Sequence, residues 1–161
     1  MKLARSCVHI HIMKSDATAA RLQEMSGCLC FNLRRAARAV THLYDAALRP
    51  FGLRGNQLSI LVAASMRDAV HMAPLAEALA MDRTTLLRNL RPLVRKKLLE
   101  VGRASGGRRT EIKATAAGRA LVARVYEPWR RAQAQARESL GNPTWVRRLG
   151  PLAEALRTAQ K

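Results

Sequence analysis

Residues 74–100 read "PLAEALAMDRTTLLRNLRPLVRKKLLE", a pattern of two helices joined by a very short connection. We predict a short helix over 74–81 and a second helix over 83–99, with Asp82 as the N-cap that accepts hydrogen bonds from the first turn. So short a connection between two helices is typical of a helix-turn-helix. Apolar residues at a spacing of four predict the buried face of the second helix: Leu86, Leu90, Val94 and Leu98.

The segment that follows changes from helical to strand periodicity. "LLEVG" (98–102) and "RTEIKAT" (109–115) alternate apolar and polar residues, and the glycine-rich, basic "RASGGR" (103–108) lies between them. We therefore predict a two-stranded hairpin with a basic tip. Helices followed by such a hairpin indicate a winged helix-turn-helix.

Long amphipathic helices are predicted on both sides of this lobe. Residues 28–49 contain neither glycine nor proline, and their apolar stripe consists of Leu33, Ala37, Val40, Tyr44 and Ala47. A shorter helix over 56–67 leads into the lobe. A long helix begins at Thr115, and one or two short helices close the chain. The stripe of the long helix consists of Leu121, Val122, Val125, Trp129, Ala132 and Ala136. One small chain cannot cover all these apolar stripes, so we expect a second copy to do so.

The expected fold class is therefore mainly α with a small β-hairpin wing, a winged helix-turn-helix flanked by N- and C-terminal dimerisation helices. Residues 1–26 lack helical periodicity and are predicted to form a flexible N-terminal arm. Residues 27–161 are expected to form a single domain, in which 27–54 and 115–161 are the dimerisation helices and 55–114 the winged helix-turn-helix lobe.

The amino-acid composition limits the classes of molecule that the chain is expected to bind. The 161 residues include 29 Lys and Arg against 11 Asp and Glu, a formal charge of +18, which attracts polyanions such as nucleic acid and, less specifically, anionic membrane surfaces. No apolar run approaches the ~18 residues of a spanning helix, and the first residues make a poor signal peptide. Three cysteines do not make a secreted disulfide framework. We expect a cytoplasmic protein with no membrane partner.

The charge concentrates where a helix-turn-helix meets DNA. Ten Lys and Arg lie between Arg83 and Lys113, opposed only by Glu100 and Glu111. A solvated face is the ordinary interpretation of such a run. Its place on the second helix and on the adjacent hairpin instead favours binding of double-stranded DNA in the major groove.

The basic and polar residues can be divided by expected role. Arg83 begins the DNA-binding helix, and the residues of its first two turns on the faces away from the core are Thr84, Thr85, Arg88 and Asn89. Arg88 can donate to guanine and Asn89 can pair with adenine, or either can instead contact a phosphate. Cations farther along are expected at phosphates: Arg91, Arg95, Lys96 and Lys97. An arginine at the wing tip, Arg108 or Arg109, is expected in the minor groove.

Three segments together resemble the multiple antibiotic resistance regulator (MarR) family of bacterial transcription factors. They are "LRRAARAVTHLYDAALRPFGLRGNQLSIL" (33–61), residues 74–100 and "TAAGRAL" (115–121). The resemblance implies a homodimer on a pseudo-palindromic operator, usually a repressor released by a small-molecule inducer or an oxidant. It places Arg108 at the family's wing-tip arginine, with Gly106 where the family usually has Asp.

The resemblance extends in part to the organic-hydroperoxide-sensing branch of the family. Cys30 lies in the "LCF" context (29–31) of the reactive cysteine, and Tyr44 matches one of the tyrosines that hold the thiolate. Arg34 and Gly55 stand where other tyrosines are expected. Arg34 lies one helical turn after Cys30 and favours a thiolate. The alternative is a small apolar cysteine packed at the dimer interface. If both are helical, Cys28 and Cys30 point too far apart for a mutual disulfide.

Other functional classes find less support. Cys7, His9 and His11 alternate as zinc ligands could on a strand, but a fourth ligand is not evident, and we expect no metal or cofactor. No phosphate-loop or nucleophile motif occurs and no carboxylate pair suggests acid–base chemistry, so an enzyme is not expected. An architectural protein that binds DNA without sequence preference remains the alternative to a regulator.

Overall fold

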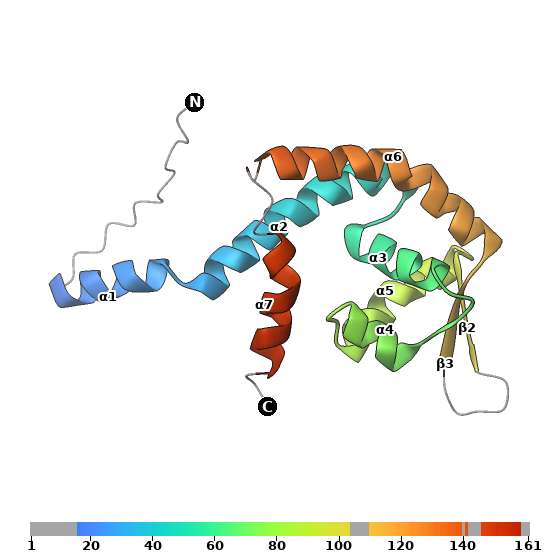
Figure 1. The fold of residues 1–161 in the computed structure, drawn as a ribbon, viewed down its shortest axis with the longest axis horizontal. Helices are drawn as coiled ribbons and strands as arrows, with labels where there is room; N and C mark the ends of the chain where they lie inside the picture. Colours follow the sequence, from blue (N-terminus) through green and yellow to red (C-terminus); the bar gives the residue numbers. More distant parts are fainter. Residues whose placement is uncertain (1–15, 104–109, 140, 142–145, 159–161) are drawn as a thin grey trace. The chain divides into compact units, whose positions relative to one another are not determined.

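The computed structural model describes residues 16–103, 110–139, 141 and 146–158, and the chain divides into two compact units, residues 1–39 and 40–161. The first unit contains α1 (Asp16–Ser26) and the first half of α2 (Leu29–Leu48) (Figure 1). The helix over 16–26 corrects the expectation of an arm without helical structure. Ala, Leu, Gln, Glu and Met fill this segment, and their intrinsic helix propensity requires no apolar stripe. Residues 1–15 of the expected arm lie outside the described residues.

The second unit confirms the winged helix-turn-helix. A short 3-10 turn (Arg49–Phe51) follows α2, and α6 (Ala116–Ser139) and α7 (Val146–Thr158) close the chain. The lobe between them contains α3 (Gly55–Ser65), β1 (Val70–His71), α4 (Met72–Ala78), α5 (Arg83–Arg95), β2 (Leu99–Arg103) and β3 (Thr110–Ala114) (Figure 1). In the lobe α3 packs against both α5 and α6.

The sheet has three antiparallel strands in the order β1-β3-β2, so the predicted two-stranded hairpin was incomplete. Ile112 on β3 is opposite Val101 of β2 on one side and Val70 of β1 on the other. A strand of two residues has too few positions to show alternation, which is why its sequence gave no signal.

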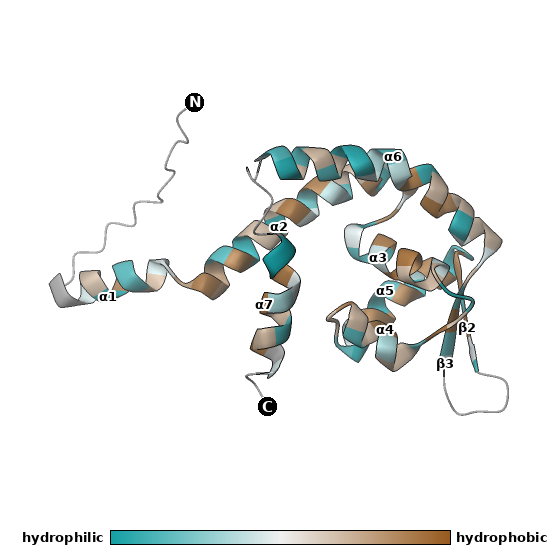
Figure 2. Cartoon of the chain, in the orientation of Figure 1, coloured by the Kyte–Doolittle hydropathy of each residue, from teal (hydrophilic) through white to brown (hydrophobic). Residues whose placement is uncertain are grey.

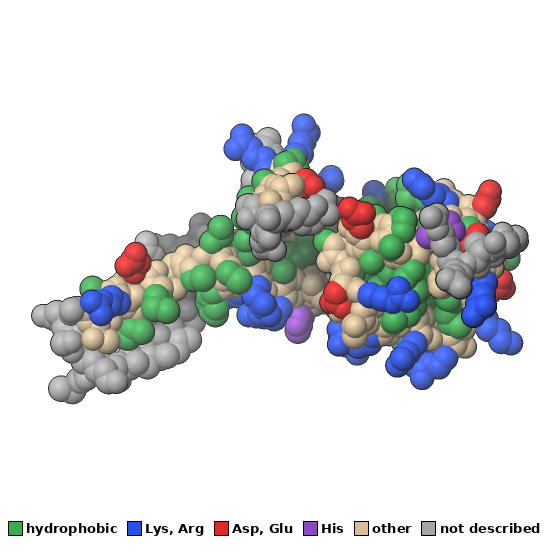
Figure 3. Space-filling view, turned by 90° about the horizontal axis from the view of Figure 1, so that it is seen from below, with side chains coloured by type: hydrophobic (Ala, Val, Ile, Leu, Met, Phe, Trp, Pro, Cys, Tyr) green, Lys and Arg blue, Asp and Glu red, His purple; other side chains and the backbone are tan. Residues whose placement is uncertain are grey.

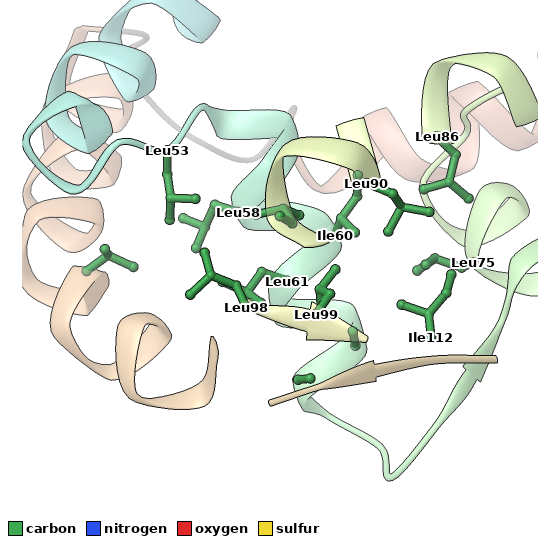
Figure 4. Packing of buried hydrophobic residues seen from close by; sticks show 14 of the residues in the cluster. Leu53, Leu58, Ile60, Leu61, Leu75, Leu86, Leu90, Leu98, Leu99 and Ile112 are labelled. Atoms are coloured by element: carbon green, nitrogen blue, oxygen red, sulfur yellow. The ribbon is translucent and has the colours of Figure 1, made fainter. Parts of the chain in front are cut away.

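The core of the lobe is built from leucine and isoleucine of α3, α5, β2 and β3 (Figure 4). Leu86, Leu90 and Leu93 are its residues from α5, whereas Val94 is 38% exposed. The prediction that Val94 belongs to the buried face of the helix was therefore wrong. An α-helix turns 100° per residue, so Leu93 rather than Val94 returns to the face of Leu86.

Helix α5 also ends earlier than predicted, at Arg95 instead of residue 99. Lys97 adopts a left-handed conformation with φ 56°, which reverses the chain after the helix. Leu98, which the sequence placed on the helix, is buried beyond this turn.

Helix α6 begins in close contact with this turn. Thr115 caps it, because its Oγ1 accepts a hydrogen bond from Gly118 N at 3.0 Å and donates one to Lys97 O at 2.8 Å. A Cβ atom on Gly118 would lie 2.2 Å from the carbonyl oxygen of Leu98, so only glycine fits there. The predicted stripe of α6 is confirmed: Val125, Ala132 and Ala136 are buried, and Leu121, Val122 and Trp129 are partly buried against the core.

Hydrophobic and hydrophilic residues are interspersed along α1, α2 and α7 (Figure 2). Several apolar side chains of these helices are exposed in a single chain. On α1 and the start of α2 they are Leu22, Met25, Leu29, Phe31 and Leu33. On α7 they are Leu149, Leu152 and Leu156. Each of these is at least 39% exposed, which leaves two apolar helix faces without a covering partner in one chain.

Candidate nucleic-acid interface and adjoining cavity

The first turn of α5 is fixed by Asp82. Thr85 donates its backbone N–H to Asp82 Oδ1 and its hydroxyl to Oδ2, both at 2.7 Å. Both bonds lower the pKa of the Asp82 carboxyl, and the bond from the backbone N–H of Thr85 has the larger effect. The predicted N-cap is thus confirmed. Thr85 is occupied within the cap, so Thr84, which is exposed beside it, is the hydroxyl presented outward.

Four arginines extend from α5 into solvent: Arg83, Arg88, Arg91 and Arg95. None of these four arginines forms an ion pair with a described residue. The ion pairs among the described residues are Lys113–Glu111 at 3.0 Å and Arg130–Glu127 at 2.9 Å. Lys and Arg side chains spread over the lobe in Figure 3. Guanidinium groups without internal carboxylate partners keep all their donors for an external anion.

Asn89 lies one turn beyond Thr85 and is half-buried. Its Nδ2 donates to Thr85 O at 2.9 Å, which holds the side-chain amide against the helix. Thr84, Arg88 and Asn89 thus lie on the first two turns of α5, and their contact with DNA stays a prediction.

Lys96 has a role that the sequence did not indicate. It lies in the turn after α5, and its Nζ donates to Gly52 O in the loop before α3. Contact with a DNA phosphate would have to replace this bond. The bond joins residues 44 positions apart, so no local pattern could reveal it.

The base of the wing is described, and its tip is not. Arg103 and Thr110 face each other as the last paired residues of β2 and β3. Arg108 and Arg109, the expected wing-tip arginines, lie with Gly106 outside the described residues.

The cysteines lie at the start of α2. The carbonyl of Cys28 accepts from Asn32 N at 3.1 Å and Asn32 Nδ2 at 3.0 Å, so Cys28 occupies the N-cap position and is not helical. Only Cys30 is helical, so the helical separation that would prevent a disulfide between Cys28 and Cys30 does not hold here. Both thiols are free and exposed in the single chain, as is Arg34.

Tyr44 lies farther along α2, 14 residues after Cys30, or about 21 Å along a helix. Its hydroxyl donates to Gln133 Oε1 of α6. Burial raises the pKa of Tyr44, with the positive charge of Arg137 acting in the opposite direction. Tyr44 is thus neutral and joins α2 to α6 within its own chain.

Beside Tyr44 lies a cavity of about 760 Å³ between the end of α2, α3 and α6. Its lining contains three aromatic residues, Tyr44, Tyr126 and Trp129, and no charged side chain. The remaining lining residues are Val40, Thr41, Gly55, Asn56, Leu58, Ser59, Val62, Ala63, Met66, Leu79, Val122 and Val125. The apolar stripes of the sequence predicted helices here, but not that their packing leaves a space.

The described part of the chain contains no cluster of three potential metal ligands, and Cys7, His9 and His11 lie outside it. No helix among the described residues has the length and apolarity needed to cross a membrane.

Comparisons with known proteins place this fold. No protein-family model and no curated protein matches the chain. Among solved structures it is similar to the transcriptional regulator MosR of M. tuberculosis in complex with DNA, with 36% identity, a TM-score of 0.75, and coverage of 83% of this chain and 99% of MosR.

Two further structures share the fold at lower identity. AbsC, a MarR family transcriptional regulator from Streptomyces coelicolor, is 21% identical with a TM-score of 0.68, over 92% of this chain and 99% of AbsC. CouR from Rhodococcus jostii, solved with p-coumaroyl-CoA, is 23% identical with a TM-score of 0.67, over 82% and 93%.

Proposed function

We propose that this chain, which belongs to the multiple antibiotic resistance regulator (MarR) family of transcriptional regulators, binds a pseudo-palindromic operator as a homodimer in the cytoplasm and represses transcription. The observation that carries the proposal is the capped, cation-rich helix α5, whose arginines have no carboxylate partners among the described residues. The similarity to MosR, solved on DNA, supports the same interpretation. The proposal assigns no catalytic reaction to the chain.

The proposed roles follow the exposure of each side chain. Thr84 and Arg88, which are exposed, read base edges with Arg83 beside them, and Asn89, which is half-buried, does so once its amide leaves Thr85 O. Arg91 and Arg95 neutralise phosphates. Arg108 or Arg109 extends the contact into the minor groove.

The homodimer is supported by the exposed apolar side chains of α1, α2 and α7. Each lies on a helix outside residues 55–114, the proposed DNA-binding lobe. A symmetric dimer presents two recognition helices to two half-sites, which is why a palindromic operator is expected.

The cavity beside Tyr44 is the proposed inducer site. It is bounded by α3, which packs against α5, so a ligand that displaces α3 also displaces the recognition helix. The ligand-bound structure of CouR, which has the same fold, agrees with a ligand site in this architecture.

Competition binding tests the function. At physiological salt, the full chain should bind DNA from its own promoter region ~10³-fold or more tightly than random duplex of equal length. Titration of labelled promoter DNA with each unlabelled competitor measures this ratio. Equal affinities would reject the regulator in favour of an architectural DNA-binding protein.

Oxidation at Cys30 is a second route to release, favoured by the exposure of its thiol. We expect an organic hydroperoxide to release wild-type protein from promoter DNA, and Cys30→Ser to remain bound. Cys28→Ser is the matched control, because its thiol is equally free and lies two residues away. Release of Cys30→Ser to the same extent as wild type would show that Cys30 is a packing residue. Since Tyr44 lies about 21 Å from Cys30 along α2, it can serve Cys30 only across the dimer, and its hydroxyl would first have to leave Gln133.

A further inference from the structure

We propose that an open pocket between the end of α2, the start of α3 and the turn after α5 binds the phosphate group of a small polyol or sugar phosphate. The pocket has a volume of about 410 Å³, which falls within the range of small-molecule sites. It shares no lining residue with the cavity beside Tyr44. This second site does not depend on the proposed function.

Three cations from separate segments line the pocket. Arg49 lies in the 3-10 turn after α2, Arg54 immediately precedes α3, and Lys96 follows α5. All three residues are exposed, and none forms an ion pair with a described residue. Like charges gathered around one pocket repel each other, and a bound anion replaces that repulsion by attraction.

The carboxylate of Asp45 also lines the pocket, but it is engaged elsewhere. Asp45 Oδ1 accepts a hydrogen bond from Gly55 N at 2.7 Å, which holds the start of α3. Asp45 forms no ion pair with the three cations. Among the described lining residues, three positive charges against one negative charge leave a net charge of two. A phosphate monoester, which is mostly a dianion above pH 7, matches that charge.

The hydrogen-bond donors of the lining also suit a phosphate. The guanidinium groups of Arg49 and Arg54 present forked donors that fit two phosphate oxygens. Gln57 Oε1 accepts from Arg54 N at 3.1 Å, which leaves both N–H groups of the Gln57 amide to donate. Lys96 Nζ donates to Gly52 O and has two further N–H groups. Phosphate oxygens only accept, so every one of these donors can serve them.

The rest of the lining distinguishes between carriers of the phosphate. No aromatic side chain lines the pocket in the described part of the chain, so it lacks a surface on which a nucleotide base can stack. The polar walls instead favour a polyol or sugar. None of the four exposed arginines of α5 lines the pocket either, which separates it from the proposed DNA contacts. A small molecule is therefore the expected source of the phosphate.

NMR titration of the 15N-labelled full chain with glycerol 3-phosphate at pH 7.5 tests the proposal. The probe should shift the backbone amide resonances of Gly52 and Gly55 until the shifts saturate. Glycerol, which lacks the phosphate, should shift neither resonance. If glycerol 3-phosphate leaves both resonances in place, or if glycerol shifts them as far, the proposal is wrong.

Two substitutions in the lining should change the dissociation constant of glycerol 3-phosphate in opposite directions. Arg49→Gln should raise it by about three- to fivefold, the loss of one exposed ion pair. Asp45→Asn should lower it by a similar factor, because it removes the opposing charge. The side-chain oxygen of asparagine can still accept the hydrogen bond from Gly55 N. Circular dichroism melting checks that both variants are folded.

Arg67→Gln and Asp68→Asn are the matched controls, because Arg67 and Asp68 are exposed and lie outside the lining of this pocket. They change the net charge of the chain exactly as the two lining variants do. Each should alter the dissociation constant by less than about twofold, since salt screens distant exposed charges. Effects as large as those of the lining variants would mean that overall charge attracts the probe, and would overturn the proposal.

DNA binding separates the two possible sources of a phosphate. Arg49→Gln should bind promoter DNA and random duplex as tightly as wild type does, with the same dependence on salt. If it instead weakens both duplexes equally and flattens the salt dependence by about one unit, the pocket holds a DNA phosphate and the small-molecule source is wrong. Promoter binding by a wild-type chain that does not bind glycerol 3-phosphate would reject this site and leave the proposed regulator in place.

Discussion

Gly118→Ala is expected to destabilise the chain by more than about 3 kcal/mol, a fall in melting temperature of roughly 10 °C. The added Cβ would lie 2.2 Å from Leu98 O and 3.1 Å from the Leu61 side chain. The Leu98 carbonyl cannot easily retreat, because it accepts the backbone N–H of Thr115 at 3.1 Å. Thermal unfolding followed by circular dichroism measures the effect.

Gly150→Ala is the matched control for this substitution. Gly150 also lies within a helix, α7, but an added Cβ meets nothing within 4 Å apart from its neighbours in sequence. Alanine there should change the free energy of unfolding by less than about 1 kcal/mol, because its better helix propensity is offset by contact of its Cβ with the adjacent Pro151 ring. If Gly118→Ala melts as high as Gly150→Ala, the close approach of α6 to Leu98 is incorrect.

Arg88→Ala is expected to weaken binding to promoter DNA by about 10- to 100-fold, the loss of one bidentate base contact, and to change binding to random duplex much less. Arg88 is exposed on the second turn of α5 and has no ion-pair partner among the described residues. Fluorescence anisotropy with the two duplexes at several salt concentrations measures both affinities.

Arg91→Ala is the comparison, because Arg91 is exposed on the same helix and is assigned to a phosphate. It should weaken both duplexes equally and flatten the dependence of log affinity on log salt by about one unit. If the two variants behave identically, the division into base-reading and phosphate-binding residues is wrong.

The fold was largely predictable because its signals are local. The spacing of Leu86 and Leu90 and the position of Asp82 each depend on residues within two turns, and the structure confirms them. The departures arise where a residue's state depends on distant parts of the chain. The helix ends at Arg95 because the chain must turn at Lys97 to bring Leu98 under α6, and β1 exists only by pairing with β3.

The candidate site shows the same division. Exposure of the α5 arginines follows from the amphipathic pattern of one helix. The bond from Lys96 to Gly52, the bond from Tyr44 to Gln133 and the uncharged cavity join elements far apart in sequence. One sequence contains no spacing that reports such contacts.

Strand β3 fixes the position of the hairpin relative to the helix-turn-helix. It pairs with β2 along one edge and with β1 along the other, and β1 runs directly into α4 at Met72. The separation between hairpin and helix-turn-helix is therefore set by main-chain hydrogen bonds, which side-chain substitutions leave in place. Substitutions at base-reading side chains of α5 can therefore change which sequence is bound without moving the base of the hairpin relative to the start of α4.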